Sequence, residues 1–134
     1  MQSEQPSDLG KEFSWVRARA ECSVASVYER IKLQVEADVA QRKEIIISAG
    51  CERLNFSIDS NGSAFTVTRV EPNSHRSVTF RTTAKGITVV DGSDNVVLEG
   101  TLTLGDDGRC RLKVSGRDLD FWQFRRTALE ELFF

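Results

Sequence analysis

The hydrophobic positions of this chain follow two periods, one of two residues and one of three to four, and these periods divide it into elements. At residues 13–22 small apolar side chains alternate with aromatic and charged ones, which predicts a strand. At residues 24–39 apolar side chains recur every three or four positions, which predicts an amphipathic helix. The three isoleucines at 45–47 fit either the last helical turn or the start of a buried strand.

From residue 53 to residue 114 the period is two throughout. Short polar stretches such as "SNGS", "DGSDN" and "GDDG" interrupt it and are typical of tight turns. The pattern therefore predicts six further strands joined as an antiparallel meander. Every strand has one apolar and one polar side, so we expect the sheet to bury a single face.

The last fifteen residues predict a second amphipathic helix. Asp120 and Gln123 have the spacing of a capping box. One face of the predicted helix is apolar and carries Phe121, Phe124, Ala128 and Leu132. An apolar sheet face needs a cover, so we expect this helix to cross the sheet, with Phe133 and Phe134 entering the core or the mouth of a cavity.

Small residues indicate where a helix can approach the sheet closely. Ala18 and Ala20 of the first predicted strand and Gly100 of a later one share the expected inward face. We therefore expect the first and last strands to pair beneath the C-terminal helix. The predicted fold is α+β: a curved antiparallel sheet of about seven strands, in the order strand, helix, six strands, helix, packed against the C-terminal helix. Residues 1–11 are expected to be a disordered leader and residues 12–134 one domain.

Three stretches, "FSWVRARAEC", the meander "RLNFSID…RLKVS" and "DFWQFRRTALEELFF", give an element order that resembles the helix-grip superfamily. This superfamily includes START-type lipid-binding domains and proteins like the birch-pollen allergen. The resemblance implies a curved sheet that grips the C-terminal helix. It also implies an interior between sheet and helix that can hold an apolar ligand.

Composition narrows the classes of function. The 134 residues suit one domain, and the net charge of −2 gives no overall attraction to nucleic acid or anionic membranes. No stretch is apolar enough for a signal peptide or a membrane span, so a cytoplasmic location is expected. The three cysteines have no metal-binding spacing. Cys22 and Cys110 are interpreted as inert buried thiols, and Cys51 as the most exposed one.

The sequence offers few candidates for catalytic or metal-binding residues. His75, the only histidine, follows Ser74 in a predicted turn, and adjacent residues rarely act as base and nucleophile on each other. The acidic turns lack the residue order of a calcium loop. We therefore predict no catalytic residue, no metal site and no cofactor. If the first and last strands pair, one patch would unite cations with Phe13 and Trp15, although nucleic-acid binding is disfavoured; its cations are Arg17, Arg19, Arg109, Arg111 and Lys113.

These observations favour a non-enzymatic domain that binds a hydrophobic small molecule, either a lipid or an aromatic metabolite, between sheet and helix. The expected ligand contacts are Phe56, Phe65, Phe80, Leu98, Leu112, Phe121, Phe124 and Leu132. The alternative is a protein-interaction or homodimerisation module with a filled core and exposed aromatic side chains. A cyclase or hydratase, a kind of enzyme found among helix-grip proteins, is less favoured because the chain shows no evident general base.

Overall fold

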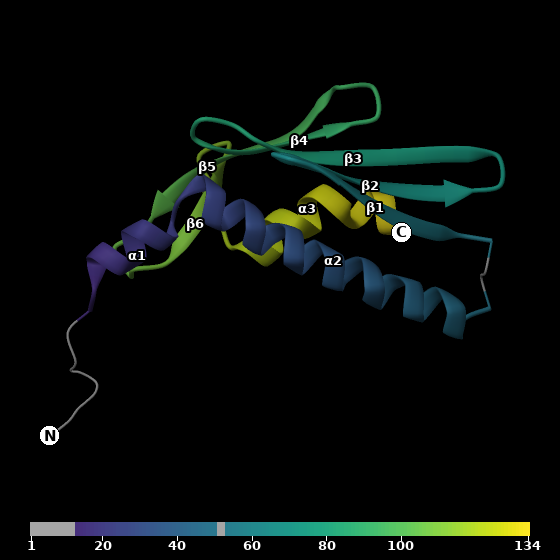
Figure 1. Cartoon of the computed structure of the whole chain (residues 1–134), viewed down its shortest axis with the longest axis horizontal. Coiled ribbons are helices and arrows are strands. Elements are labelled where there is room, and N and C mark those ends of the chain that lie inside the picture. Colours follow the sequence, from purple (N-terminus) through teal and green to yellow (C-terminus); the bar gives the residue numbers. More distant parts are fainter. Residues whose placement is uncertain (1–12, 51–52) are drawn as a thin grey trace, which may run out of the picture.

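The computed structural model describes residues 13–50 and 53–134, and this part of the chain forms three helices and a seven-stranded sheet. The predicted leader at residues 1–11 lies outside the described residues. Two helices come first, the strands follow in an unbroken series, and a helix comes last (Figure 1). The elements are α1 (Trp15–Glu21), α2 (Val24–Ser48), β1 (Asn55–Asn61), β2 (Ala64–Glu71), β3 (Ser74–Thr82), β4 (Gly86–Asp91), β5 (Val96–Leu104), β6 (Cys110–Val114), β7 (Arg117–Leu119) and α3 (Phe121–Phe133).

The first element is a helix, so the prediction of a strand at residues 13–22 is wrong. Ser14 caps α1 by accepting a hydrogen bond from a first-turn amide at 3.4 Å. Ala18 and Ala20 are strong helix formers, and they outweigh the short alternation around them. No residue of α1 is buried, so the two alanines do not supply a floor for α3.

Helix α2 runs through the three isoleucines, which settles that ambiguity in favour of helix. Ser23 is its N-cap, and its hydroxyl accepts a hydrogen bond from the Ser26 amide at 3.2 Å. Gly50 follows the C-cap with φ of +77°, the left-handed conformation that favours glycine at a helix end. One face of α2 is buried against the sheet; it carries Val27, Tyr28, Ile31, Val35, Val39 and Ile46.

The sheet is a pure antiparallel meander in which each strand pairs with the next, from β1 to β7. The predicted pairing of residues 13–22 with the strand at residues 110–114 is wrong, because residues 15–21 are helical and β6 pairs with β5 and β7. The predicted α+β class and the number of strands are confirmed, but the seventh strand is β7, which the sequence pattern did not reveal. Ser115 and Gly116 join it to β6 with φ of 52° and 83°, as a tight two-residue hairpin requires.

Helix α3 covers the same face of the sheet as α2, and the two helices lie side by side (Figure 1). The predicted capping box is present: the Asp120 amide donates to the Gln123 side chain at 2.8 Å. Helix α3 contacts β3, β5, β6 and β7. The prediction that Gly100 permits a close crossing is confirmed, because a Cβ there would lie 2.7 Å from the Phe124 ring.

Three arginines hold the C-terminal end of α3. Arg42 of α2 donates to the Phe133 carbonyl at 2.8 Å, Arg69 of β2 to the Leu132 carbonyl at 2.9 Å, and Arg76 of β3 to the Glu131 carbonyl at 3.2 Å. Cations at a helix C-terminus complement the helix dipole and satisfy its last carbonyls. Phe133 is buried in the core, whereas Phe134 is exposed and its ring lies 4.3 Å from the Arg42 guanidinium.

Candidate functional site

The side chains predicted to contact a ligand pack mainly against one another in the core. Phe65 and Phe80 stack with ring centroids 4.7 Å apart, and Phe80 meets Phe124 edge-on at 6.4 Å. Phe56, Leu98, Leu112 and Leu132 are buried in the same cluster, and Phe121 packs at its margin. These contacts give the eight side chains a role in stability. Ligand binding by them stays a prediction, and only Phe121 lines one of the two hollows described next.

The first hollow lies between the outer faces of α2 and α3, and we call it the helix groove. Its volume is about 290 Å³. Apolar side chains from both helices form much of its wall, and several are conspicuously exposed: Ile45 at 51%, Trp122 at 53% and Phe134 at 78%. Its lining residues are Asp38, Gln41, Arg42, Ile45, Trp122, Arg125, Arg126, Leu129, Glu130, Phe133 and Phe134.

An ion pair fixes the spacing of the two helices along this groove. Arg125 of α3 donates to the Asp38 carboxylate at 2.7 Å and to the Gln34 side chain at 2.9 Å, both on α2. The Arg125 and Asp38 side chains are only 17% and 29% exposed, so this bridge is partly buried. A partly buried arginine with two hydrogen-bond partners holds α3 at a defined position on α2. It also gives the groove a polar end.

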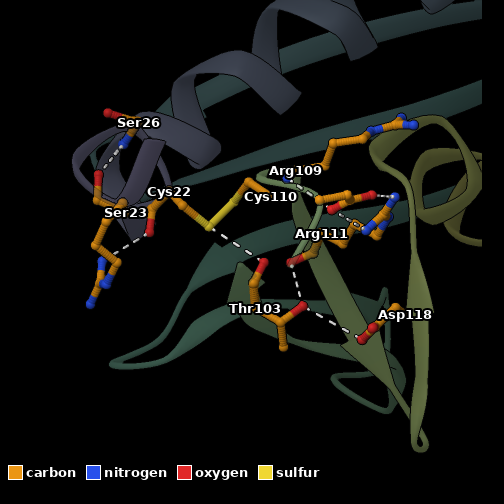
Figure 2. Close-up of a disulfide and its surroundings, with 10 residues drawn as sticks. Cys22, Ser23, Ser26, Thr103, Arg109, Cys110, Arg111 and Asp118 are labelled. Atoms are coloured by element: carbon orange, nitrogen blue, oxygen red, sulfur yellow. Dashed lines mark hydrogen bonds and ion pairs between the residues drawn. A yellow bond between two sulfur atoms is a disulfide. The ribbon is translucent and has the colours of Figure 1, made fainter. Parts of the chain in front are cut away.

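The second hollow lies beside a disulfide between Cys22 and Cys110, and Cys110 is one of its lining residues. Cys22 lies where α1 joins α2 and Cys110 begins β6, so the bond ties the N-terminal helices to the far part of the sheet (Figure 2). The Cys22 sulfur also lies 3.5 Å from the Thr103 carbonyl oxygen of β5. The interpretation of Cys22 and Cys110 as inert thiols is therefore wrong. Cys51, the third cysteine, lies outside the described residues.

This second hollow, which we call the arginine cleft, lies between α1, the start of α2, the turn before β6 and the start of α3. Its volume is about 720 Å³, and it is lined by four arginines and two carboxylates, together with Phe13, Phe121 and Trp122. The Phe13 ring packs so closely on Gly108 that a Cβ there would overlap it. The charged lining residues are Arg17, Arg30, Arg109, Arg125, Glu21 and Asp120.

The structure brings part of the predicted basic patch together, but by a different route. Arg17 and Arg109 meet at the arginine cleft because the disulfide joins their segments, not because two strands pair. Arg111 instead bonds Asp107 at 2.7 Å and Asp120 at 3.0 Å. Hydrogen bonds from Arg111 and then from the Arg109 amide lower the pKa of Asp107 to about 2, and the two carboxylates raise the pKa of Arg111.

In the described part of the chain, the other candidate catalytic and metal-binding residues do not form a site. Ser74 and His75 are exposed at the start of β3, and the Ser74 hydroxyl donates to Glu71 at 3.2 Å. Within residues 13–50 and 53–134, no group of histidine, cysteine or acidic residues has the geometry to hold a metal ion. None of the described helices combines the length and apolar character that a bilayer crossing requires.

The helix groove was missed by the sequence analysis, although one signal was present. Ile45 and Trp122 stand outside the apolar stripes of their helices, so neither was needed to cover the sheet. Two off-stripe apolar side chains on neighbouring helices could have indicated a second apolar contact surface.

Comparisons with known proteins add no identification. The sequence matches no protein-family model, and neither the curated proteins nor the solved structures give a match.

Proposed function

We propose that this domain binds a hydrophobic small molecule in the helix groove between α2 and α3. The observation that carries the proposal is the cluster of exposed apolar side chains around this hollow, formed by Ile45, Trp122 and Phe134. Large apolar side chains gathered around a concavity are typical of ligand sites, whereas scattered ones need no explanation. The volume of about 290 Å³ is just below the range of such sites, about 300–1,000 Å³.

This site differs from the interior site that the helix-grip resemblance implies. A ligand between sheet and helix would have to displace phenylalanine rings that already contact one another. A ligand in the helix groove would displace only water from apolar surface, which favours binding by about 25 cal/mol per Å² buried. The groove is therefore the less costly place for an apolar compound.

Titration with N-phenyl-1-naphthylamine, a neutral dye that fluoresces in apolar surroundings, tests the proposal. We expect saturable binding and an Ile45→Ser variant with about five- to tenfold weaker affinity, because one aliphatic contact is lost. Leu33→Ser is the matched control, since Leu33 is 65% exposed on α2 but does not line the groove. Equal affinities for the two variants, or no saturable binding, would exclude this function.

A homodimer is the alternative occupant of the same apolar surface. Sedimentation of the dye-free protein separates the two functions, because a dimer would bury the groove against a second copy. A concentration-dependent dimer that Ile45→Ser dissociates and Leu33→Ser preserves would replace ligand binding as the proposed function.

A further inference from the structure

The helix groove and the arginine cleft adjoin each other. Trp122 and Arg125 line both hollows, so these two residues mark the place where the hollows meet. The partly buried bridge from Arg125 to Asp38 and Gln34 joins α3 to α2 at this point. We call the apolar groove and the charged cleft together the trough, because they share Trp122 and Arg125 of α3.

The arginine cleft has an excess of positive charge. Its four arginines face only two carboxylates, in a chain whose net charge is −2. Arg125 is paired with Asp38, and Asp120 is shared between Arg109 at 3.4 Å and Arg111 at 3.0 Å. Within the described residues, Arg17 and Arg30 have no carboxylate within 4.0 Å, and Arg30 instead lies over the Phe121 ring at 5.5 Å. Two arginines at one end of the trough are therefore available to an anion.

The helix groove has the length of an extended alkyl chain. Helices α2 and α3 run in the same direction away from the cleft (Figure 1). Trp122 and Phe133 are eleven residues apart on α3, a rise of about 16 Å at 1.5 Å per residue. A molecule in the groove that reaches back to Arg17 or Arg30 must be elongated, with its apolar part on the Phe133 side.

We propose that the ligand is a free single-chain fatty acid, with its tail in the helix groove and its carboxylate at Arg17 and Arg30. This inference rests on the proposed function, because it assumes that the groove binds an apolar group. Guanidinium groups bind carboxylates through paired, charge-assisted hydrogen bonds. Trp122 and Arg125 line both hollows, and Phe121 lines the carboxylate end.

Calorimetric titration with dodecanoate and with dodecanol, both kept below the concentration at which they aggregate, tests this inference. We expect dodecanoate to bind about tenfold more tightly than dodecanol. The Arg17→Gln/Arg30→Gln variant should lose most of this difference and keep its affinity for dodecanol. Added salt should weaken dodecanoate binding alone, because the head-group contact is exposed.

The matched control is the Arg81→Gln/Lys85→Gln variant, which removes the same charge away from both hollows. It should bind both compounds as the wild-type protein does. Equal wild-type affinities for dodecanoate and dodecanol would overturn the fatty-acid inference but leave the proposed function standing. An equal loss of both compounds in Arg17→Gln/Arg30→Gln would overturn it too, as would binding to phosphatidylglycerol vesicles without binding to dodecanoate. Absence of binding by either compound and by the neutral dye would refute the proposed function itself.

Discussion

Gly100 on β5 sets the distance between the sheet and the last helix. A Cβ at this position would lie 2.7 Å from Phe124 Cε1 and 3.2 Å from two atoms of Leu112. Both neighbours are fully buried, so neither side chain has free space into which it can move. The absence of one methyl group therefore allows α3 to pack directly on the centre of the sheet.

We expect Gly100→Ala to lower the free energy of unfolding by about 1–3 kcal/mol, because overpacking forces neighbouring side chains out of their preferred conformations. Chemical denaturation followed by tryptophan fluorescence measures this change. Gly92→Ala is the control, since the added methyl group would meet only the Ser77 hydroxyl at 3.3 Å. If both variants unfold at the wild-type denaturant concentration, the close contact of Phe124 with Gly100 does not limit how closely α3 packs on the sheet.

At the scale of elements, α1 depends on the disulfide for its position. It buries none of its own residues, whereas Cys22 at its end is buried and bonded to Cys110. The disulfide spans 88 residues of sequence, and closing so long a loop restricts the unfolded chain strongly. One covalent bond therefore both stabilises the fold and holds together the segments that line the arginine cleft.

Alkylation under denaturing conditions tests the disulfide. We expect one labelled cysteine, Cys51, without reductant and three after reduction with dithiothreitol, as counted by mass spectrometry. The Cys22→Ser/Cys110→Ser variant should be less stable by about 2–4 kcal/mol. Three labelled cysteines without reductant would contradict the bond. Disulfides are typical of proteins from oxidising compartments, so the same experiment bears on the cytoplasmic location, which stays a prediction.

The sequence predicted most elements but failed at the shortest helix and the shortest strand. The strands from β1 to β6 and the helix α3 have long, consistent periods, and the capping box at Asp120 marks where α3 begins. Helix α1 has seven residues, too few to distinguish a period of two from one of 3.6, and β7 has only three. The wrong strand at residues 13–22 then led to the wrong pairing of first and last strands.

The candidate site was less predictable than the fold, because it depends on tertiary contacts. Nothing in the local sequence pairs Cys22 with Cys110, and their bond is what brings Arg17 near Arg109. The groove likewise requires that α2 and α3 lie side by side, a relation that a hydrophobic period does not specify. The period does identify buried faces, which is why seven of the eight predicted ligand contacts are buried core residues.

At the scale of the whole molecule, ionised carboxylates couple stability to pH. Three acidic side chains have lowered pKa values: Glu71 chiefly through a hydrogen bond from Arg69, Asp91 through the amides of Asn95 and Ser93, and Asp107 through Arg111. A group whose pKa is lower in the folded state stabilises the fold above its unfolded pKa. That contribution disappears as pH falls through the folded pKa.

We therefore expect stability to decline as pH falls below about 4.5, with the contribution of Asp107 lost between 3.8 and about 2. Thermal unfolding at a series of pH values measures this decline. The Glu71→Gln/Asp91→Asn/Asp107→Asn variant should show a flatter dependence on pH. The matched control is Asp59→Asn/Asp106→Asn/Glu99→Gln, which removes the same charge at exposed positions. Equal slopes for both variants would mean that these hydrogen bonds do not govern acid sensitivity.

The bond between Cys22 and Cys110 also closes the chain between them into a covalent loop. Helix α2 and the strands β1 to β5 all lie between the two cysteines. A protease that cuts one peptide bond anywhere in this loop leaves both pieces attached to each other through the disulfide. The nicked protein would remain one covalently linked molecule until a reductant separates the two fragments.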